Sequence, residues 1–147
     1  MKKTLLWSLL ALLLAPQISC QSEKEILYIG TAGMNDSQGI YVYEYERNTN
    51  TFTLLQTLPE INAPNFLALH PSGDYLYSVN DIAGEDGKKL DAVSAFAIDG
   101  ATGMLTLLNQ VPSYGRGNCH IELDRTGKFV YVAHYGSGEL TVFSIAA

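Results

Sequence analysis

The hydrophobic pattern along most of the chain is that of short β-strands separated by tight turns. Residues 41–45 (YVYEY) and 129–132 (FVYV) are rich in aromatic and β-branched side chains, which favour strands. Glycine-containing turn signals lie between such segments, for example at residues 71–74 (PSGD) and 136–138 (GSG). No stretch after residue 20 has a sustained helical period. We therefore predict an all-β fold.

This strand pattern repeats after about 50 residues. Residues 40–57 align with residues 93–110, and residues 65–77 align with residues 119–131. A period of roughly 40–50 residues is typical of the blades of a β-propeller. The alignment predicts strands near residues 26–31, 40–46, 52–57, 65–70, 75–80, 92–98, 104–110, 118–124, 128–134 and 139–145.

The predicted strands do not divide evenly into blades. The middle repeat has a full set of four, whereas the first repeat lacks its leading strand and the third lacks its last. Propellers have about 4–8 blades and protect their sheet edges by closing into a ring. We therefore expect the chain to hold about two and a half blades of a longer protein. The missing C-terminal blades would be its structural partner, and the chain alone is expected to be inactive.

The first residues have the pattern of an export signal. Two lysines at residues 2–3 precede an uncharged apolar stretch at residues 5–15. This stretch fits the roughly 7–15-residue core of a signal peptide and is shorter than the about 20 residues of a membrane span. We predict a signal peptide at residues 1–19.

The residues that follow resemble the lipobox of bacterial lipoproteins, in which a small residue precedes a lipid-bearing cysteine. Here the segment is Ile18-Ser19-Cys20. The resemblance implies lipid attachment at Cys20, a linker at residues 20–25 and a propeller domain at residues 26–147. The mature protein would be exported and anchored to a membrane, in the periplasm or at the cell surface.

Composition narrows the class of partner. The hydrophobic content of 47% is normal for a globular chain and too high for a disordered one. The formal net charge of −6 argues against nucleic acid, because phosphate binding needs a basic face. The sequence has two cysteines and no metal-ligand spacing or phosphate-binding loop. We predict no nucleic-acid partner, no metal and no cofactor.

Several segments together resemble the β-propeller lactonase family, which is 6-phosphogluconolactonase-like. In the family's order they are YIGT at 28–31, SQGIYVYEYE at 37–46, PNFLALHPSGDYLYSVND at 64–81, VSAFAID at 93–99 and GNCHIELDRTGKFVYVAHYGSGELTVF at 117–143. The resemblance implies a seven-bladed propeller and hydrolysis of a small-molecule sugar lactone by attack of water on the ring ester. Two alternatives remain open: a carboxymuconate-lactone-type cyclase, and a membrane-anchored propeller that binds a ligand or protein without catalysis.

Hydrolysis of a lactone needs a base that activates water, and a phosphorylated substrate also needs a cationic partner. His120 is the candidate catalytic residue, because Phe66 occupies the matching position of the preceding repeat. Arg116, in a glycine-flanked loop, is a candidate for binding a phosphate or carboxylate. His134 and Tyr135 end the next strand and are candidates for lining the same site. The structural alternatives are a backbone-satisfied histidine, a solvated arginine and a hydrogen-bonded turn.

Other polar positions have simpler interpretations. His70 and Asp124 precede matching turns, so we expect both to bond the turn backbone. We expect Cys119 to be a packed thiol, because a free cysteine usually behaves as a small buried apolar residue. We interpret the charged stretch at residues 81–91 as a solvated loop.

Overall fold

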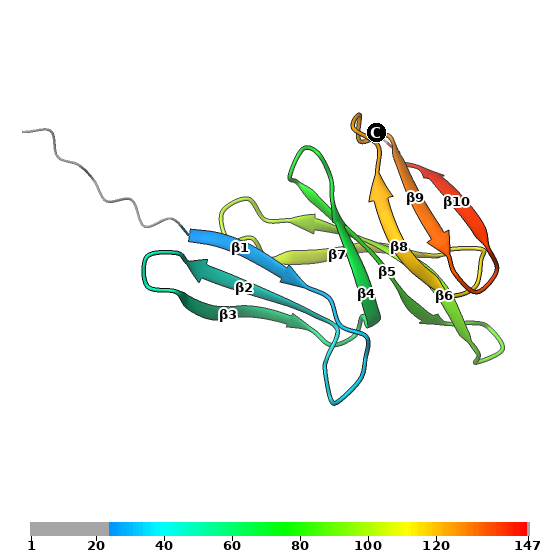
Figure 1. Cartoon of the computed structure of the whole chain (residues 1–147), viewed down its shortest axis with the longest axis horizontal. Coiled ribbons are helices and arrows are strands. Elements are labelled where there is room, and N and C mark those ends of the chain that lie inside the picture. The colour runs from blue at the N-terminus through cyan, green and yellow to red at the C-terminus, as the bar shows by residue number, and fades with distance from the viewer. Residues whose placement is uncertain (1–23, 147) are drawn as a thin grey trace, which may run out of the picture.

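The computed structural model describes residues 24–146, which form ten strands and no helix (Figure 1). No helix among these residues is long and apolar enough to span a membrane. The strands are β1 (Lys24–Ile29), β2 (Ile40–Glu46), β3 (Thr51–Leu58), β4 (Asn62–Leu69), β5 (Tyr75–Ala83), β6 (Lys89–Ile98), β7 (Leu105–Pro112), β8 (Asn118–Leu123), β9 (Phe129–His134) and β10 (Glu139–Ser144). The predicted all-β fold is confirmed, with each predicted strand displaced by only a few residues. Cys20 and the signal segment lie outside the described residues.

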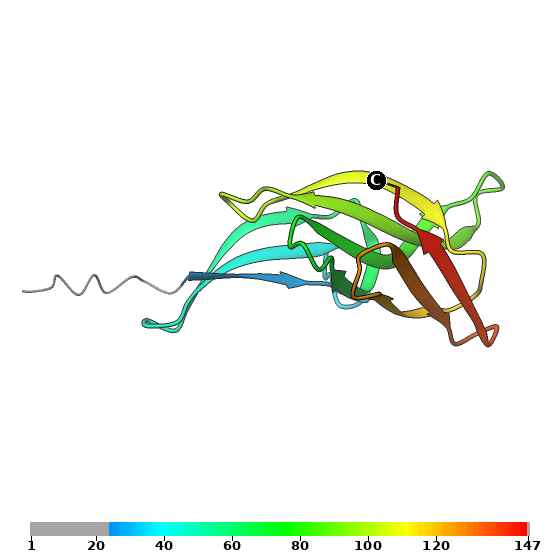
Figure 2. The same ribbon diagram turned by 90° about the horizontal axis from the view of Figure 1, so that it is seen from above.

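The strands form three antiparallel sheets in the order β1-β2-β3, β4-β5-β6-β7 and β8-β9-β10. Figures 1 and 2 show the four-stranded sheet between the other two along the long axis of the molecule. The sequence repeat relates β2 and β3 to β6 and β7, and β8 and β9 to β4 and β5. This is the predicted blade pattern, in which β4 and β8 are the first and innermost strands of consecutive blades.

The four-stranded sheet is apolar on both faces because alternate residues of a strand point to opposite sides. On one face Leu76 and Phe96 pack with Ile40 and other residues of the first sheet. On the opposite face Val79 packs with Ile121 and other residues of the third sheet. The middle sheet therefore holds the two flanking sheets in place through two separate cores.

Five connections gather at one end of the blades: those between β1 and β2, β3 and β4, β5 and β6, β7 and β8, and β9 and β10. We call this end the loop rim, and define it as residues 30–39, 59–61, 84–88, 113–117 and 135–138. All candidate site residues except His120 lie on or beside the loop rim.

The prediction of a solvated loop at residues 81–91 is confirmed for the connection at residues 84–88 and wrong for the two ends of the segment. Strand β5 continues to Ala83 and β6 begins at Lys89, so the connection is short. Asp81 is buried, and its Oδ2 lies 2.6 Å from Nζ of Lys89 on the neighbouring strand. The cross-strand ion pair compensates the buried charge and lets charged residues extend the hairpin.

Candidate functional site

His120 lies on the inner strand β8, where it meets the preceding blade. Its ring packs against that of Phe66 on β4, with the ring centroids 4.4 Å apart and the planes tilted by 52°. His120 is exposed, and Phe66 is 39% exposed. The inner strands of neighbouring blades approach one another, so a surface shared by two blades carries the histidine.

A β-bulge in β8 sets the direction of the residues before His120. The pairing register between β8 and β9 shifts between Asn118 and His120. Cys119 falls at this shift and is exposed, with its thiol 3.6 Å from the carbonyl oxygen of Ala133. The expectation of a packed thiol is therefore wrong, because a bulge interrupts the inward-outward alternation that the sequence pattern assumes.

Arg116 lies in a loop whose backbone is tied to the turn at residues 135–138. Its N–H donates to Oγ of Ser137 at 3.1 Å, and its carbonyl accepts from the N–H of Gly136 at 3.0 Å. The next carbonyl, of Gly117, accepts from the N–H of Tyr135 at 2.8 Å. The Arg116 residue is exposed, and no carboxylate of the described residues forms an ion pair with it.

The glycines beside Arg116 have a role that sequence reasoning did not find. Because glycine has no Cβ, other groups can approach its backbone closely. In the structure, a Cβ at Gly115 would lie 2.3 Å from Cγ of His134. Gly117 adopts a φ of +68° and packs against Gly136. Both glycines are therefore explained by contacts within the chain.

His134 lies beneath this loop and is only 2% exposed. Its Nε2 lies 3.0 Å from Oγ1 of Thr141, and this hydroxyl donates to the carbonyl of Ser113 at 2.8 Å. Since the single hydroxyl proton is used there, Nε2 carries the proton that His134 donates to Thr141. Nδ1 is then a buried acceptor with no partner among the described residues. The buried His134 therefore supports the Arg116 loop that lies over it. Tyr135, the next residue, is 89% exposed and accessible.

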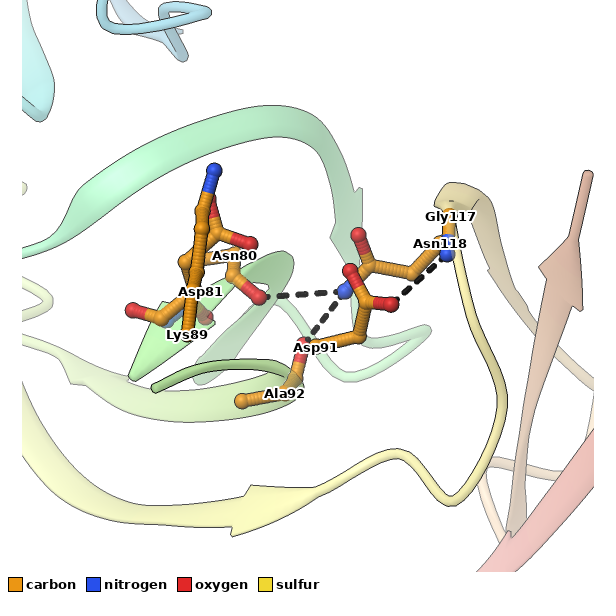
Figure 3. A network of polar contacts seen from close by, with 7 residues as sticks. All are labelled: Asn80, Asp81, Lys89, Asp91, Ala92, Gly117 and Asn118. Carbon is orange, nitrogen blue, oxygen red and sulfur yellow. Dashed lines mark hydrogen bonds and ion pairs between the residues drawn. The ribbon is translucent and has the colours of Figure 1, made fainter. Parts of the chain in front are cut away.

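The start of β8 is clamped to the middle blade by Asn118 and Asp91 (Figure 3). Nδ2 of Asn118 donates to the carbonyls of Asn80 and Ala92, both at 3.0 Å. Oδ2 of Asp91 accepts from the N–H of Gly117 at 2.6 Å. These bonds fix the backbone on the N-terminal side of the bulge, between Arg116 and His120.

Sequence reasoning did not single out Asn118, although a signal was present. The repeat that matches His120 to Phe66 also matches Asn118 to Pro64. At both repeated positions an apolar residue of one blade is replaced by a polar residue in the next. This change distinguishes His120 and Asn118 from their counterparts. The same comparison that found the exposed histidine would have found the clamp.

The structure brings Arg116, His134 and Tyr135 together at two adjoining loops and places His120 on the strand that follows the first of them. Among residues 24–146, no group of three or more His, Cys, Asp or Glu side chains is placed to hold a metal ion.

The expected turn roles of His70 and Asp124 are confirmed. Nδ1 of His70 accepts from the N–H of Ser72 at 3.1 Å, and its Nε2 lies 3.0 Å from the carbonyl of Gly127 in the next blade. The Asp124 carboxylate accepts from the hydroxyl of Thr126 and from backbone N–H groups of its turn. These hydrogen bonds, the one from Thr126 first, lower the pKa of Asp124 to about 2.

Consecutive antiparallel blades that meet at their inner strands define a β-propeller. Residues 26–147 match the family model described as "Lactonase, 7-bladed beta-propeller". The chain therefore belongs to this lactonase family, and the resemblance seen in the sequence is confirmed.

Named relatives agree with this assignment. A 6-phosphogluconolactonase of Formosa agariphila is 36% identical over 107 residues, which are 73% of this chain and 30% of that protein. A 6-phosphogluconolactonase of Bacillus subtilis is 31% identical over 122 residues, which are 83% of this chain and 34% of that protein. The crystal structure of a candidate 6-phosphogluconolactonase from Bacteroides fragilis matches with a TM-score of 0.73 and 30% identity, covering 87% of this chain and 34% of that one. The chain thus spans about a third of the length of these relatives.

Proposed function

We propose that this chain supplies part of the active site of a propeller lactonase that hydrolyses a sugar lactone of the 6-phosphogluconolactone type. Membership of the lactonase family and relatives named 6-phosphogluconolactonase support the reaction class. The observation that carries the site is the exposed ring of His120 on an inner strand, beside Phe66 of the preceding blade.

In this proposal His120 is the general base. Its imidazole takes a proton from a water molecule, and the water oxygen attacks the carbonyl carbon of the ring ester. The tetrahedral intermediate collapses with cleavage of the ring C–O bond. The imidazolium then returns the proton to the ring oxygen, so one water and one lactone give one open hydroxy acid.

The loop-rim residues have binding roles in this proposal. The exposed Arg116 binds a phosphate or carboxylate of the substrate, because its backbone is fixed and it has no ion-pair partner among the described residues. Tyr135 contributes an exposed aromatic ring on the adjoining turn. His134 is buried, and we assign it the positioning of the Arg116 loop.

The test measures lactone hydrolysis by the protein expressed from its complete gene, with glucono-1,5-lactone and its 6-phosphate as substrates. We expect His120→Ala to lower kcat/KM at least about tenfold without lowering the unfolding temperature. The matched control is His70→Asn, which removes a histidine from a turn on the opposite end of the blades. Absence of hydrolysis by the folded wild-type protein overturns the proposal and favours the non-catalytic propeller. Unchanged kinetics in His120→Ala removes His120 from the site.

The comparison of the two substrates tests Arg116. If Arg116 binds phosphate, Arg116→Gln raises KM for the phosphorylated lactone much more than for the unphosphorylated one. Equal effects on both substrates would exclude a phosphate-binding role.

We also propose that the protein is an exported lipoprotein anchored through Cys20, as the sequence pattern of residues 1–20 supports. Labelling with radioactive palmitate tests this. We expect incorporation in wild type and in Cys119→Ser, which retains the proposed anchor, and none in Cys20→Ser. Labelling that survives Cys20→Ser would refute the anchor.

A further inference from the structure

A polar cavity lies on the loop rim of the middle blade, separate from the ring of His120. Its volume is about 410 Å³, within the range of roughly 300–1,000 Å³ seen for small-molecule sites. The lining residues used below are Glu60, Asn62, Asp81, Lys89 and Gln110. Glu60 comes from the β3–β4 connection, and each of the other four comes from a different strand of the blade.

Asp81 is the buried charge of this cavity. Its side chain is 9% exposed, and Oδ2 lies 2.6 Å from Nζ of Lys89. No hydrogen-bond donor of the described residues reaches the other oxygen, Oδ1. Because Asp81 lines the cavity, this oxygen is an acceptor that remains available to a ligand.

The backbone that carries Asp81 is held in place by the strands around it, and Lys89 is the partner of its carboxylate. Asn62 and Asp91 are the direct cross-strand neighbours of Asp81 on β4 and β6. The carbonyl of Asp81 accepts from Nδ2 of Asn80 at 3.2 Å, and Asn80 is itself held by Asn118. Asp81 is therefore fixed before any ligand binds, which reduces the entropy lost on binding.

The charges select the kind of ligand. Two carboxylates, Asp81 and the exposed Glu60, and two ammonium groups, Lys88 and Lys89, line the cavity, so its formal charges balance and favour no strongly charged ligand. The Lys89 ammonium has three donors, and its contact with Asp81 leaves others free. The amide of Asn62 adds a donor and an acceptor, and it forms no hydrogen bond with a described side chain. Alternating fixed acceptors and donors fit hydroxyl groups, each of which donates once and accepts.

We propose that this cavity binds the hydroxyl groups of a neutral, polyhydroxylated ligand, with Asp81 Oδ1 accepting from one hydroxyl and Lys89 Nζ donating to the next. The cavity opens at the start of β4, the strand that also carries Phe66 beside His120. The cavity would therefore hold the polyol part of a sugar lactone. In this respect the proposal for the cavity rests on the proposed function. The binding itself requires no catalysis.

The test is calorimetric titration of the full protein with glucono-1,5-lactam, a neutral analogue of the lactone that does not hydrolyse. We expect saturable binding in wild type. Asp81→Asn should weaken it about 5- to 10-fold, because the amide oxygen still accepts but lacks the charge that strengthens the hydrogen bond. Lys89→Met should weaken binding in the same direction.

The matched control is Asp36→Asn. Asp36 is an exposed carboxylate in the β1–β2 connection and does not line the cavity. This variant should bind the lactam as wild type does. Thermal unfolding of each variant separates lost binding from lost folding, and the Asp81→Asn, Lys89→Met double variant provides a folded cavity without either charge.

The outcomes distinguish the two proposals. Weakened lactam binding in Asp81→Asn upholds the cavity even if wild type hydrolyses no lactone, in which case only the lactonase proposal fails. Lactone hydrolysis together with equal lactam affinity in wild type and Asp81→Asn overturns the cavity alone. Lack of saturable binding by wild type up to about 10 mM also overturns it.

Discussion

The rings of His120 and Phe66, which hold matching positions in consecutive sequence repeats, are in direct contact with centroids 4.4 Å apart. Equivalent positions on inner strands become neighbours because the strands of adjacent blades converge. A ligand that reaches the imidazole must therefore also meet the phenyl ring. The apolar member of the pair is part of the environment of the polar one.

Replacing Phe66 tests this contact. Phe66→Ala removes the ring that orients the imidazole, and an aromatic pair of this kind contributes about 0.5–1.5 kcal/mol. We expect kcat/KM for lactone hydrolysis to fall by roughly 2- to 12-fold. Phe66→Tyr keeps the ring and should retain most of the activity. Equal losses in both variants would show that the ring contact is not the relevant property.

Asn118 is expected to stabilise the junction between the middle and third blades. Asn118→Ala leaves the buried carbonyls of Asn80 and Ala92 without their shared donor. The free energy of unfolding should fall by about 1–3 kcal/mol, measured by denaturant titration. Asn109→Ala, at an exposed position of β7, is the control and should change it little. Equal stability of the two variants would contradict the clamp.

Gly115 is expected to tolerate no side chain. In Gly115→Ala the new Cβ would lie 2.3 Å from Cγ of His134, whose ring is buried. A loss of about 1–3 kcal/mol in unfolding free energy is the expected cost of such overpacking. Gly100→Ala places its Cβ where no atom lies within 4 Å and should be nearly neutral. If Gly115→Ala is as stable as Gly100→Ala, the loop does not rest on His134.

Stability at low pH should depend on Asp124. Its pKa is lowered from 3.8 to about 2 in the folded chain, so its ionised form stabilises the fold above pH 3.8. This contribution is lost as the pH falls from about 4 to about 2.

The free energy of unfolding should be measured between pH 5 and pH 2 for wild type and Asp124→Asn. Its slope with pH reports the difference in bound protons between the folded and unfolded states. The variant should show a shallower decline over this range. Asp36→Asn, in an exposed loop, is the control. Parallel curves for wild type and Asp124→Asn would show that the turn hydrogen bonds do not survive in solution.

The strands and their order could be predicted because alternating aromatic and β-branched residues mark each strand and glycine turns separate them. The repeat added the assignment to blades. The extension of β5 to Ala83 and of β6 back to Lys89 could not be predicted, because Asp81 and Lys89 have the composition of a solvated loop. Only the distance of 2.6 Å between Oδ2 of Asp81 and Nζ of Lys89 reveals that each charge compensates the other.

The candidate site was predictable only in part. Polarity specific to one blade identified His120, and the same comparison contains a signal for Asn118. The burial of His134 could have been deduced, because it continues the alternation of β9 in which Val130 and Val132 are also buried. The exposure of Cys119 could not, because a bulge interrupts the alternation of β8 without a local sequence signature. The contacts that decide these positions join segments far apart in the chain.

The apolar character of both faces of the middle sheet has a consequence for how its strands find their alignment. A slip by one residue exchanges the faces of a strand, and hydrophobicity opposes the slip only when one face is polar. In β5 the polar residues distinguish the correct register from a slipped one. Oδ1 of Asn80 accepts from the hydroxyls of Ser78 and Ser94 on one face, while Asp81 meets Lys89 on the other. A slipped strand would bury these groups without partners, so the polar residues encode the register that the hydrophobic ones leave undetermined.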